Sequence, residues 1–191
     1  IMSMRMIPNL LVFRPADTLE TAECWELAMQ ADATPSVLAL TRQNLAAVRD
    51  DANVNLCAKG AYRLRAANGE RKAVLIATGS EVAIALQVSE KLAAQGIETD
   101  VISMPCTALF DAQDAAYKAD LMPADVLKVS IEAGTTFGWE RYTGLDGLRF
   151  GIDSFGASAP IDDLYAHFGL TADDVMPFGA KVSVEYPLFT S

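Results

Sequence analysis

The sequence predicts an α/β fold with a mostly parallel sheet, and three observations support this. Short apolar runs alternate along the chain with longer segments of helical periodicity. Gly and Pro residues separate these segments, so that each run predicts one strand or one helix. The 191 residues, of which 51% are hydrophobic and 21% charged, can bury a substantial core. A disordered, collagen-like or disulfide-stapled chain is therefore excluded.

A strand–helix–strand unit is predicted near the N-terminus. The apolar run 10–13 stops just before a proline and predicts a buried strand. Asp17 is expected to cap a helix over 17–31, with the Glu20 side chain reaching back to the cap amide. The run 37–40 predicts a second strand, and the crossover helix makes it parallel to the first. The helix is expected to bury one apolar face, formed by Leu19, Ala22, Trp25 and Met29.

A more regular series of strands and helices is predicted after an exposed connector at 45–60. Its strands are expected over 62–65, 74–78, 99–103, 126–131 and 149–152. Its helices are expected from 80 to the turn at Gly96, then over 111–119, 139–143 and 160–168, and again from 171. The turn Asn68-Gly69 predicts a hairpin at the sheet edge. Four basic residues are expected to protect that edge, namely Arg63, Arg65, Arg71 and Lys72.

Charge and cysteine content narrow the class of protein. The net charge of −10 disfavours binding to nucleic acid or to an anionic membrane. No apolar stretch approaches the about 20 residues of a membrane span, and no signal peptide is recognisable. Cys24, Cys57 and Cys106 are scattered, which favours a reducing compartment, so we expect a cytoplasmic protein. Because the chain opens with Ile1 rather than Met, further sequence is expected upstream.

Three polar residues are candidates for chemistry, but a structural role is favoured for each. His167 is the single histidine and would have to serve every acid–base role. Ser80 follows a strand at a glycine turn, where capping a helix is favoured over binding an anion. Glu132 also ends a strand; capping the segment at Trp139 or pairing with Arg141 is favoured over carrying a proton. The spacing of histidine and cysteines fits no zinc site.

Arg42 is the most informative candidate. It lies in Thr41-Arg42-Gln43-Asn44, at the carboxyl end of the strand predicted over 37–40, where α/β sheets present ligand-contacting groups. Its guanidinium could donate two hydrogen bonds to a phosphate. It could equally be a surface arginine paired with a carboxylate, and the residues alone leave both interpretations open.

Several collinear stretches within residues 3–175 resemble the transketolase family. They are Ile7-Pro8-Asn9-Leu10, Arg14-Pro15-Ala16-Asp17, Leu40-Thr41-Arg42-Gln43-Asn44-Leu45, Ile76-Ala77-Thr78-Gly79-Ser80-Glu81-Val82, Ser103-Met104-Pro105, Phe110-Asp111-Ala112-Gln113-Asp114, Ile131-Glu132-Ala133-Gly134 and Phe155-Gly156-Ala157-Ser158-Ala159-Pro160. The resemblance implies that residues 1–50 are the end of a pyrimidine-binding domain and 51–60 a linker. Residues 61–178 would form a three-layer α/β C-terminal domain with a mixed, mostly parallel sheet, followed by an atypical tail at 179–191.

The resemblance also implies a function for the complete protein. Transketolases transfer a two-carbon ketol unit between sugar phosphates, in the pentose phosphate pathway, as homodimers. They use thiamine diphosphate and a divalent metal, Mg or Ca. Arg42 resembles the arginine that binds the substrate phosphate. The family's catalytic, cofactor and metal residues correspond to no position here, so we expect this chain alone to bind no cofactor and to be inactive.

Two alternatives remain. The chain could be a separate, non-catalytic subunit of a split transketolase, in which case residues 1–44 would expose an apolar face or edge to a partner. It could also be part of a related thiamine diphosphate enzyme, such as a deoxyxylulose-phosphate synthase or a dehydrogenase E1 subunit. The tail departs from the family, because Met176-Pro177-Phe178-Gly179 should break a helix and residues 182–186 alternate like a strand.

Overall fold

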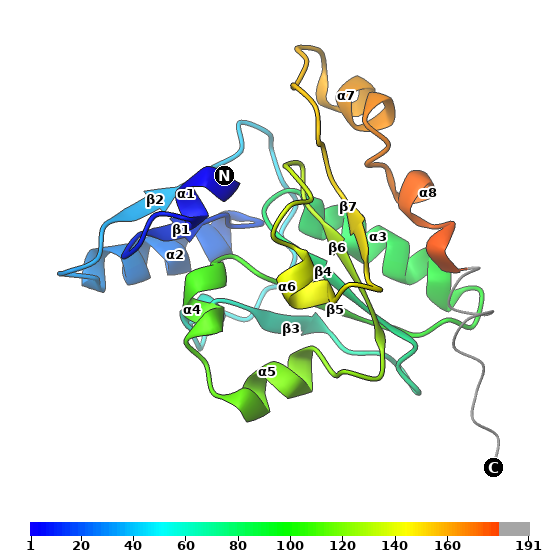
Figure 1. Cartoon of the computed structure of the whole chain (residues 1–191), viewed down its shortest axis with the longest axis horizontal. Coiled ribbons are helices and arrows are strands. Elements are labelled where there is room, and N and C mark those ends of the chain that lie inside the picture. Colours follow the sequence, from blue (N-terminus) through cyan, green and yellow to red (C-terminus); the bar gives the residue numbers. More distant parts are fainter. Residues whose placement is uncertain (180–191) are drawn as a thin grey trace.

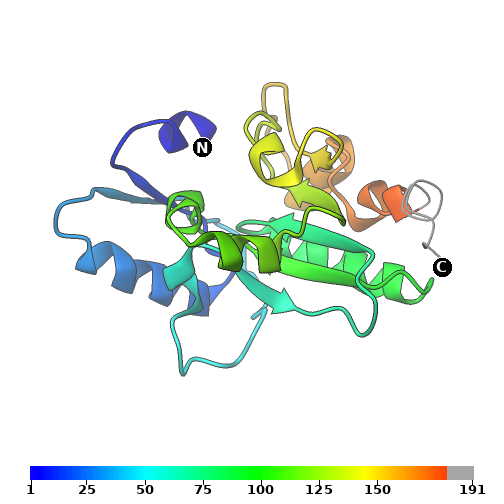
Figure 2. The same ribbon diagram turned by 60° about the horizontal axis from the view of Figure 1, so that its bottom comes forward.

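The computed structural model describes residues 1–179 and contains two sheets (Figure 1). A small N-terminal unit carries a two-stranded sheet, and a larger unit carries a five-stranded sheet. In both views the N-terminal elements lie to one side of the larger sheet and the last helices to the other (Figures 1 and 2). The predicted α/β class is confirmed.

The N-terminal unit has the predicted strand–helix–strand order. Its elements are α1 (Met2–Arg5), β1 (Leu11–Phe13), α2 (Thr18–Gln30) and β2 (Ser36–Leu38). The strands pair in parallel, with Val12 opposite Val37. Asp17 caps α2 by accepting a 2.8 Å hydrogen bond from the Glu20 amide. The expected return contact is shifted by one residue, because the Glu20 carboxylate accepts from the amide of Ala16 rather than from that of the cap.

The predicted apolar face of α2 is wrong for this chain. Trp25 is 51% exposed and Met29 is 74% exposed, whereas the helix buries Glu20, Glu23 and Cys24. The buried side packs against a 3₁₀ helix, Leu56–Lys59, at the end of the predicted exposed connector. The polar groups buried there find partners across this contact, as with the Cys57 amide, which donates to the Glu23 carboxylate. Periodicity identified an apolar face but not which face the larger unit would cover.

The larger sheet has the order β3-β5-β4-β6-β7. Its strands are β3 (Tyr62–Arg65), β4 (Ala73–Ala77), β5 (Thr99–Ser103), β6 (Leu127–Ile131) and β7 (Leu148–Phe150). All neighbours are parallel except β3, which is antiparallel to β5 at one edge. The mixed, mostly parallel sheet is therefore as expected.

Helices cover both faces of this sheet and make three layers (Figures 1 and 2). One face packs against α3 (Glu81–Ala93) and α8 (Ala172–Val175), in a core that includes Leu75, Val129 and Leu92. The other face packs against α4 (Thr107–Asp111), α5 (Ala115–Leu121) and α6 (Glu140–Thr143). A further helix, α7 (Ile161–His167), precedes α8.

Two predicted elements differ from the structure. The turn at Asn68-Gly69 closes no hairpin between β3 and β4, because β5 lies between those strands. The helix predicted over 111–119 is two helices, and Asp114 caps the second by accepting from the Tyr117 amide. The basic residues near the sheet edge pair with acidic side chains: Arg63 and Arg71 with Asp100, Arg65 with Glu90, and Lys72 with Glu70.

A separate core joins the two units. It consists of Phe13, Cys24, Cys57, Tyr62 and Cys106, all of which are buried. No helix in residues 1–179 is long and apolar enough to cross a membrane. The strand pattern noted at 182–186 lies outside the described residues.

Candidate functional site

The carboxyl ends of five strands, β1, β2, β4, β6 and β7, converge between the two units. The segments that follow β1, β2 and β4, together with the 152–168 region, line a cavity of about 400 Å³. Arg14, Thr41, Ser80, Glu81 and Tyr165 contribute its polar groups. Because parallel strands present ligand-contacting groups at their carboxyl ends, this is the candidate site.

Arg42 lies in the exposed loop that leaves β2 toward this cavity. Within residues 1–179 its side chain makes no hydrogen bond or ion pair, so its guanidinium has no carboxylate partner there. The loop is held locally by a 3.1 Å hydrogen bond from the Gln43 amide to the Thr41 hydroxyl. Thr41 and Gln43 also line a neighbouring hollow of about 200 Å³. Arg42 can therefore reach an anion without first breaking a contact with this part of the chain.

A nearly buried ion-pair network lies beside the cavity, and sequence analysis did not anticipate it. Arg14 follows β1 and donates to Glu132 at 2.7 Å and to Glu81 at 3.0 Å. Arg5 donates to both carboxylate oxygens of Glu132, each at 2.8 Å. The available signal was that Arg14, Glu81 and Glu132 each come within a few residues of the end of a buried apolar run.

Glu132 contacts the Trp139 segment, as one of the two favoured interpretations expected, and it also contacts two arginines that were not expected. It does not pair with Arg141, whose guanidinium pairs instead with Asp111. The indole N–H of Trp139 donates to Glu132 at 2.7 Å, which holds the segment that begins α6. Burial would raise the pKa of the Glu132 carboxyl, but the positive charges of Arg5 and Arg14 hold that pKa below its usual value. These contacts favour the charged form of Glu132.

Ser80 stands before α3, but its side chain does not cap the helix. Its hydroxyl instead donates to Glu81 at 2.7 Å and lies 3.1 Å from the hydroxyl of Tyr165. Tyr165 donates to the same Glu81 oxygen at 2.7 Å. Burial, with the nearby charge of Glu81, raises the pKa of Tyr165. Ser80 and Tyr165 therefore complete the hydrogen bonding of a buried carboxylate.

His167 is exposed at the C-terminal end of α7, where its ring contacts Phe168. It lies outside the ion-pair network. Among the described residues, no group of three or more His, Cys, Asp or Glu side chains is arranged to hold a metal ion. We assign no metal or cofactor ligand to this part of the protein.

Two family models match the chain along its length. Residues 1–48 match the transketolase pyrimidine-binding domain, and residues 60–171 match the transketolase-like C-terminal domain. The two units of the structure correspond to these two matches.

Individual proteins give the same result. A transketolase of Sinorhizobium medicae is 51% identical over 175 residues, which are 91% of this chain and 25% of that protein. The crystal structure of a Pichia stipitis transketolase in complex with sedoheptulose 7-phosphate superimposes with a TM-score of 0.88 at 35% identity, over 97% of this chain and 27% of that one.

A chain of a split-gene transketolase, described as an inactive β4 tetramer, has a TM-score of 0.77 at 23% identity. It is matched over 94% of this chain and 59% of that chain, and this likeness bears on the fold alone.

Both family models and the relatives point to one family and set aside the related thiamine diphosphate enzymes. The chain spans about a quarter of the length of the curated relatives it matches. We conclude that it belongs to the transketolase family, of which it contains the end of the pyrimidine-binding domain and the C-terminal domain.

Proposed function

We propose that this chain is the C-terminal part of a transketolase that transfers a two-carbon ketol unit between sugar phosphates. The observation that carries the proposal is the collinear match to two successive transketolase domains. In the complete protein, thiamine diphosphate would supply the carbanion that carries the ketol unit. We further propose a divalent metal, Mg or Ca, a cytoplasmic homodimer and a place in the pentose phosphate pathway.

The domain limits form part of the proposal. Residues 1–50 end the pyrimidine-binding domain, 51–60 link the domains, 61–178 form the C-terminal domain, and 179–191 are a tail. In this arrangement the chain itself supplies substrate binding rather than catalysis. It should neither bind thiamine diphosphate nor turn over by itself, and ketol transfer by the purified chain with cofactor and magnesium would contradict this.

Arg42 is proposed to bind the substrate phosphate. Its exposed position, without a carboxylate partner in residues 1–179, leaves the guanidinium fork available to two phosphate oxygens. The relative from Pichia stipitis was crystallised with a sugar phosphate, which is consistent with such a ligand. Thr41 and Gln43 would hold the loop through their mutual hydrogen bond.

The test is substitution in the complete protein that carries this segment. Arg42→Ala should raise KM for phosphorylated sugars at least about tenfold and change KM for unphosphorylated sugars much less. Arg65→Ala, at a partly exposed arginine paired with Glu90, is the matched control and should change neither KM. Equal losses for both kinds of sugar would refute the phosphate role of Arg42.

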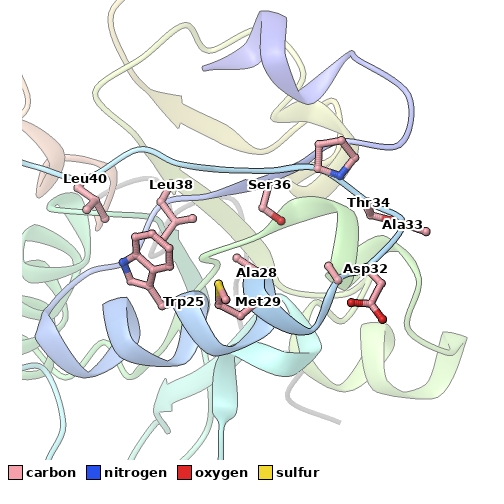
Figure 3. Close-up of a pocket in the computed structure, with 11 residues that line it drawn as sticks. Trp25, Ala28, Met29, Asp32, Ala33, Thr34, Ser36, Leu38 and Leu40 are labelled. Carbon is pink, nitrogen blue, oxygen red and sulfur yellow. The ribbon is translucent and has the colours of Figure 1, made fainter.

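A second candidate is a natural, separate subunit that docks onto a partner carrying the cofactor domains. The observation that favours it is an open apolar groove of about 680 Å³ between α2 and β2 (Figure 3). Trp25, Met29, Leu38 and Leu40 line it, and three of these four are at least half exposed. An exposed apolar face of this kind is what a subunit that docks onto a partner would present.

The intact mass of the expressed gene product separates the two candidates. A product about four times larger than this chain supports the first, because the chain spans about a quarter of its relatives. A natural 191-residue product supports the second.

A further inference from the structure

The crevice at the carboxyl ends of β4 and β6 lies where open α/β sheets bind their ligands. These two strands are adjacent and parallel near the middle of the larger sheet. From β4 the chain crosses to β5 on one side, and from β6 it crosses to β7 on the other. Such a reversal of direction opens a crevice between neighbouring connections. The topology therefore marks a ligand position that the proposed function does not use.

The crevice offers two carboxylates, which also accept from Ser80, Tyr165 and Trp139. Glu81 follows β4, Glu132 follows β6, and their side chains are 0% and 2% exposed. Gly79 stands at the rim with φ of +62°, and a Cβ there would come within 3.2 Å of the Arg14 guanidinium. The positive φ favours glycine here, and a side chain would press on the guanidinium that occupies this place. Two buried carboxylates that are close together repel each other, so they are stable only with positive charge between them.

The occupants are two arginines from the N-terminal unit. The Arg14 fork spans the crevice and gives one N–H group to each carboxylate. Arg5 forms a two-bond contact with Glu132 and lies over the Trp139 ring, 5.6 Å from its centroid. All four charged side chains are at most 11% exposed. A guanidinium binds carboxylates in this geometry better than an ammonium does, because its N–H donors lie in one plane and match the carboxylate oxygens.

We propose that this crevice is a guanidinium-recognition site, through which the C-terminal domain docks the pyrimidine-binding segment. The position that could hold a small ligand in such a sheet instead receives Arg14, with Arg5 beside it. The docking fixes the end of β1, because the Arg14 amide also donates to Pro105 and its carbonyl accepts from Gly79. This role does not depend on what Arg42 binds.

A site that recognises guanidinium should accept a free one when Arg14 is truncated. In the 191-residue chain, Arg14→Ala should lower the Tm by about 10 °C, since it leaves two buried carboxylates with too little positive charge. Millimolar ethylguanidinium should then raise the Tm of Arg14→Ala by about 3 °C or more beyond any rise in the Tm of the unsubstituted chain. The rise should level off as the concentration increases. Ethylammonium should not do so, because it lacks the planar fork.

Two control variants separate recognition from a general effect of the salt. Arg63→Ala removes an arginine that also bridges two carboxylates, those of Asp100 and Asp120, but at a partly exposed position. It should show no saturable rescue. The double variant Arg14→Ala/Glu81→Gln should lose the rescue, because one of the two recognising carboxylates is gone.

The proposal is overturned if Arg14→Ala and Arg63→Ala respond alike, if ethylammonium is as effective, or if no rescue occurs. Should Arg14→Ala fail to fold, Arg14→Lys decides the matter. Lysine keeps the charge but lacks the planar fork that reaches both carboxylates, so the Tm of Arg14→Lys should fall well below that of the unsubstituted chain. An unchanged Tm for Arg14→Lys would show that charge alone suffices and would overturn the proposal.

Discussion

The Tyr62 hydroxyl donates a 2.8 Å hydrogen bond to the carboxylate of Glu20, across the boundary between the two units. Glu20 belongs to α2 and is fully buried, whereas Tyr62 begins β3 of the larger sheet. The Ser103 hydroxyl and the Ala16 amide also donate to this carboxylate. The N-terminal unit is thus held by buried polar contacts as well as by the shared apolar core.

Tyr62→Phe should lower the free energy of unfolding by about 2 kcal/mol. The substitution removes a buried hydrogen bond to Glu20 and another from Arg49 Nε to the same hydroxyl, at 3.0 Å. Urea denaturation measures the change. Tyr117→Phe is the matched control; its hydroxyl donates to the Ala61 carbonyl, so about 1 kcal/mol is expected. Equal losses would show that the contact with Glu20 has no special weight.

Glu132→Gln should lower the free energy of unfolding at neutral pH by about 3 kcal/mol, because Arg5 and Arg14 lose a buried charged partner. The same carboxyl should make stability pH-dependent. Burial raises the pKa of this carboxyl, but the two arginines lower it by more than burial raises it. The folded pKa therefore lies below the usual 4.5. Its contribution is therefore complete above about pH 4.5 and is lost as the pH falls through the folded pKa.

Denaturation curves at several acid pH values test that dependence. The unsubstituted chain should lose stability below about pH 4.5 more steeply than Glu132→Gln does. Asp120→Asn serves as the control, because its side chain is 62% exposed and solvent screens its pairing with Arg63. If Glu132→Gln keeps the full acid slope, the ion pairs with Arg5 and Arg14 do not act as described.

Truncation of the two tryptophans should change stability by very different amounts. Trp25→Ala should change the free energy of unfolding of this chain by less than about 1 kcal/mol, because half of the side chain is already exposed. Trp139→Ala should cost about 4 kcal/mol, because the ring is 2% exposed and packs in the core with Ile76 and Phe110. A large loss for Trp25→Ala would mean that the groove between α2 and β2 is covered in solution, for example by a second copy.

The three cysteines should be protected from thiol reagents while the two units stay together. Cys24, Cys57 and Cys106 are at most 1% exposed in the core that joins the units. The hydrogen bond with Cys24 and burial raise the pKa of Cys57, and burial raises that of Cys106, so thiolate is scarce.

Reaction with a chromogenic disulfide at pH 8 should be roughly 100-fold slower in buffer than in urea. In urea all three thiols should react. Rapid reaction of any of the three in buffer would indicate that the N-terminal unit separates readily from the larger sheet.

The agreement between sequence and structure is greatest where signals are local. The runs that became β1 and β4 are short, apolar and stopped by turn residues, so their existence and most of their limits could be predicted. The cap at Asp17 depends on its own backbone and on Glu20 three residues away. The exposed loop of Arg42 follows from its place after a strand, although its ligand stays a prediction.

The differences arise where distant segments meet. Neither the pairing of β3 with β5 nor the partners of Glu132 can be derived from spacing, because Arg5 and Arg14 lie more than 100 residues away. The exposed Trp25 is a second example, since periodicity predicts that a helix face is apolar but not whether another part of the protein covers it.

The sequence by itself determined the α/β class, the order of strands and helices and the resemblance to the transketolase family, because periodicity, turns and motifs are encoded over short distances. Only the tertiary structure decided which carboxylates face which arginines and which apolar face stays open. The energy of a buried charge depends on what lies a few ångströms away in space, and chain folding alone brings those groups together.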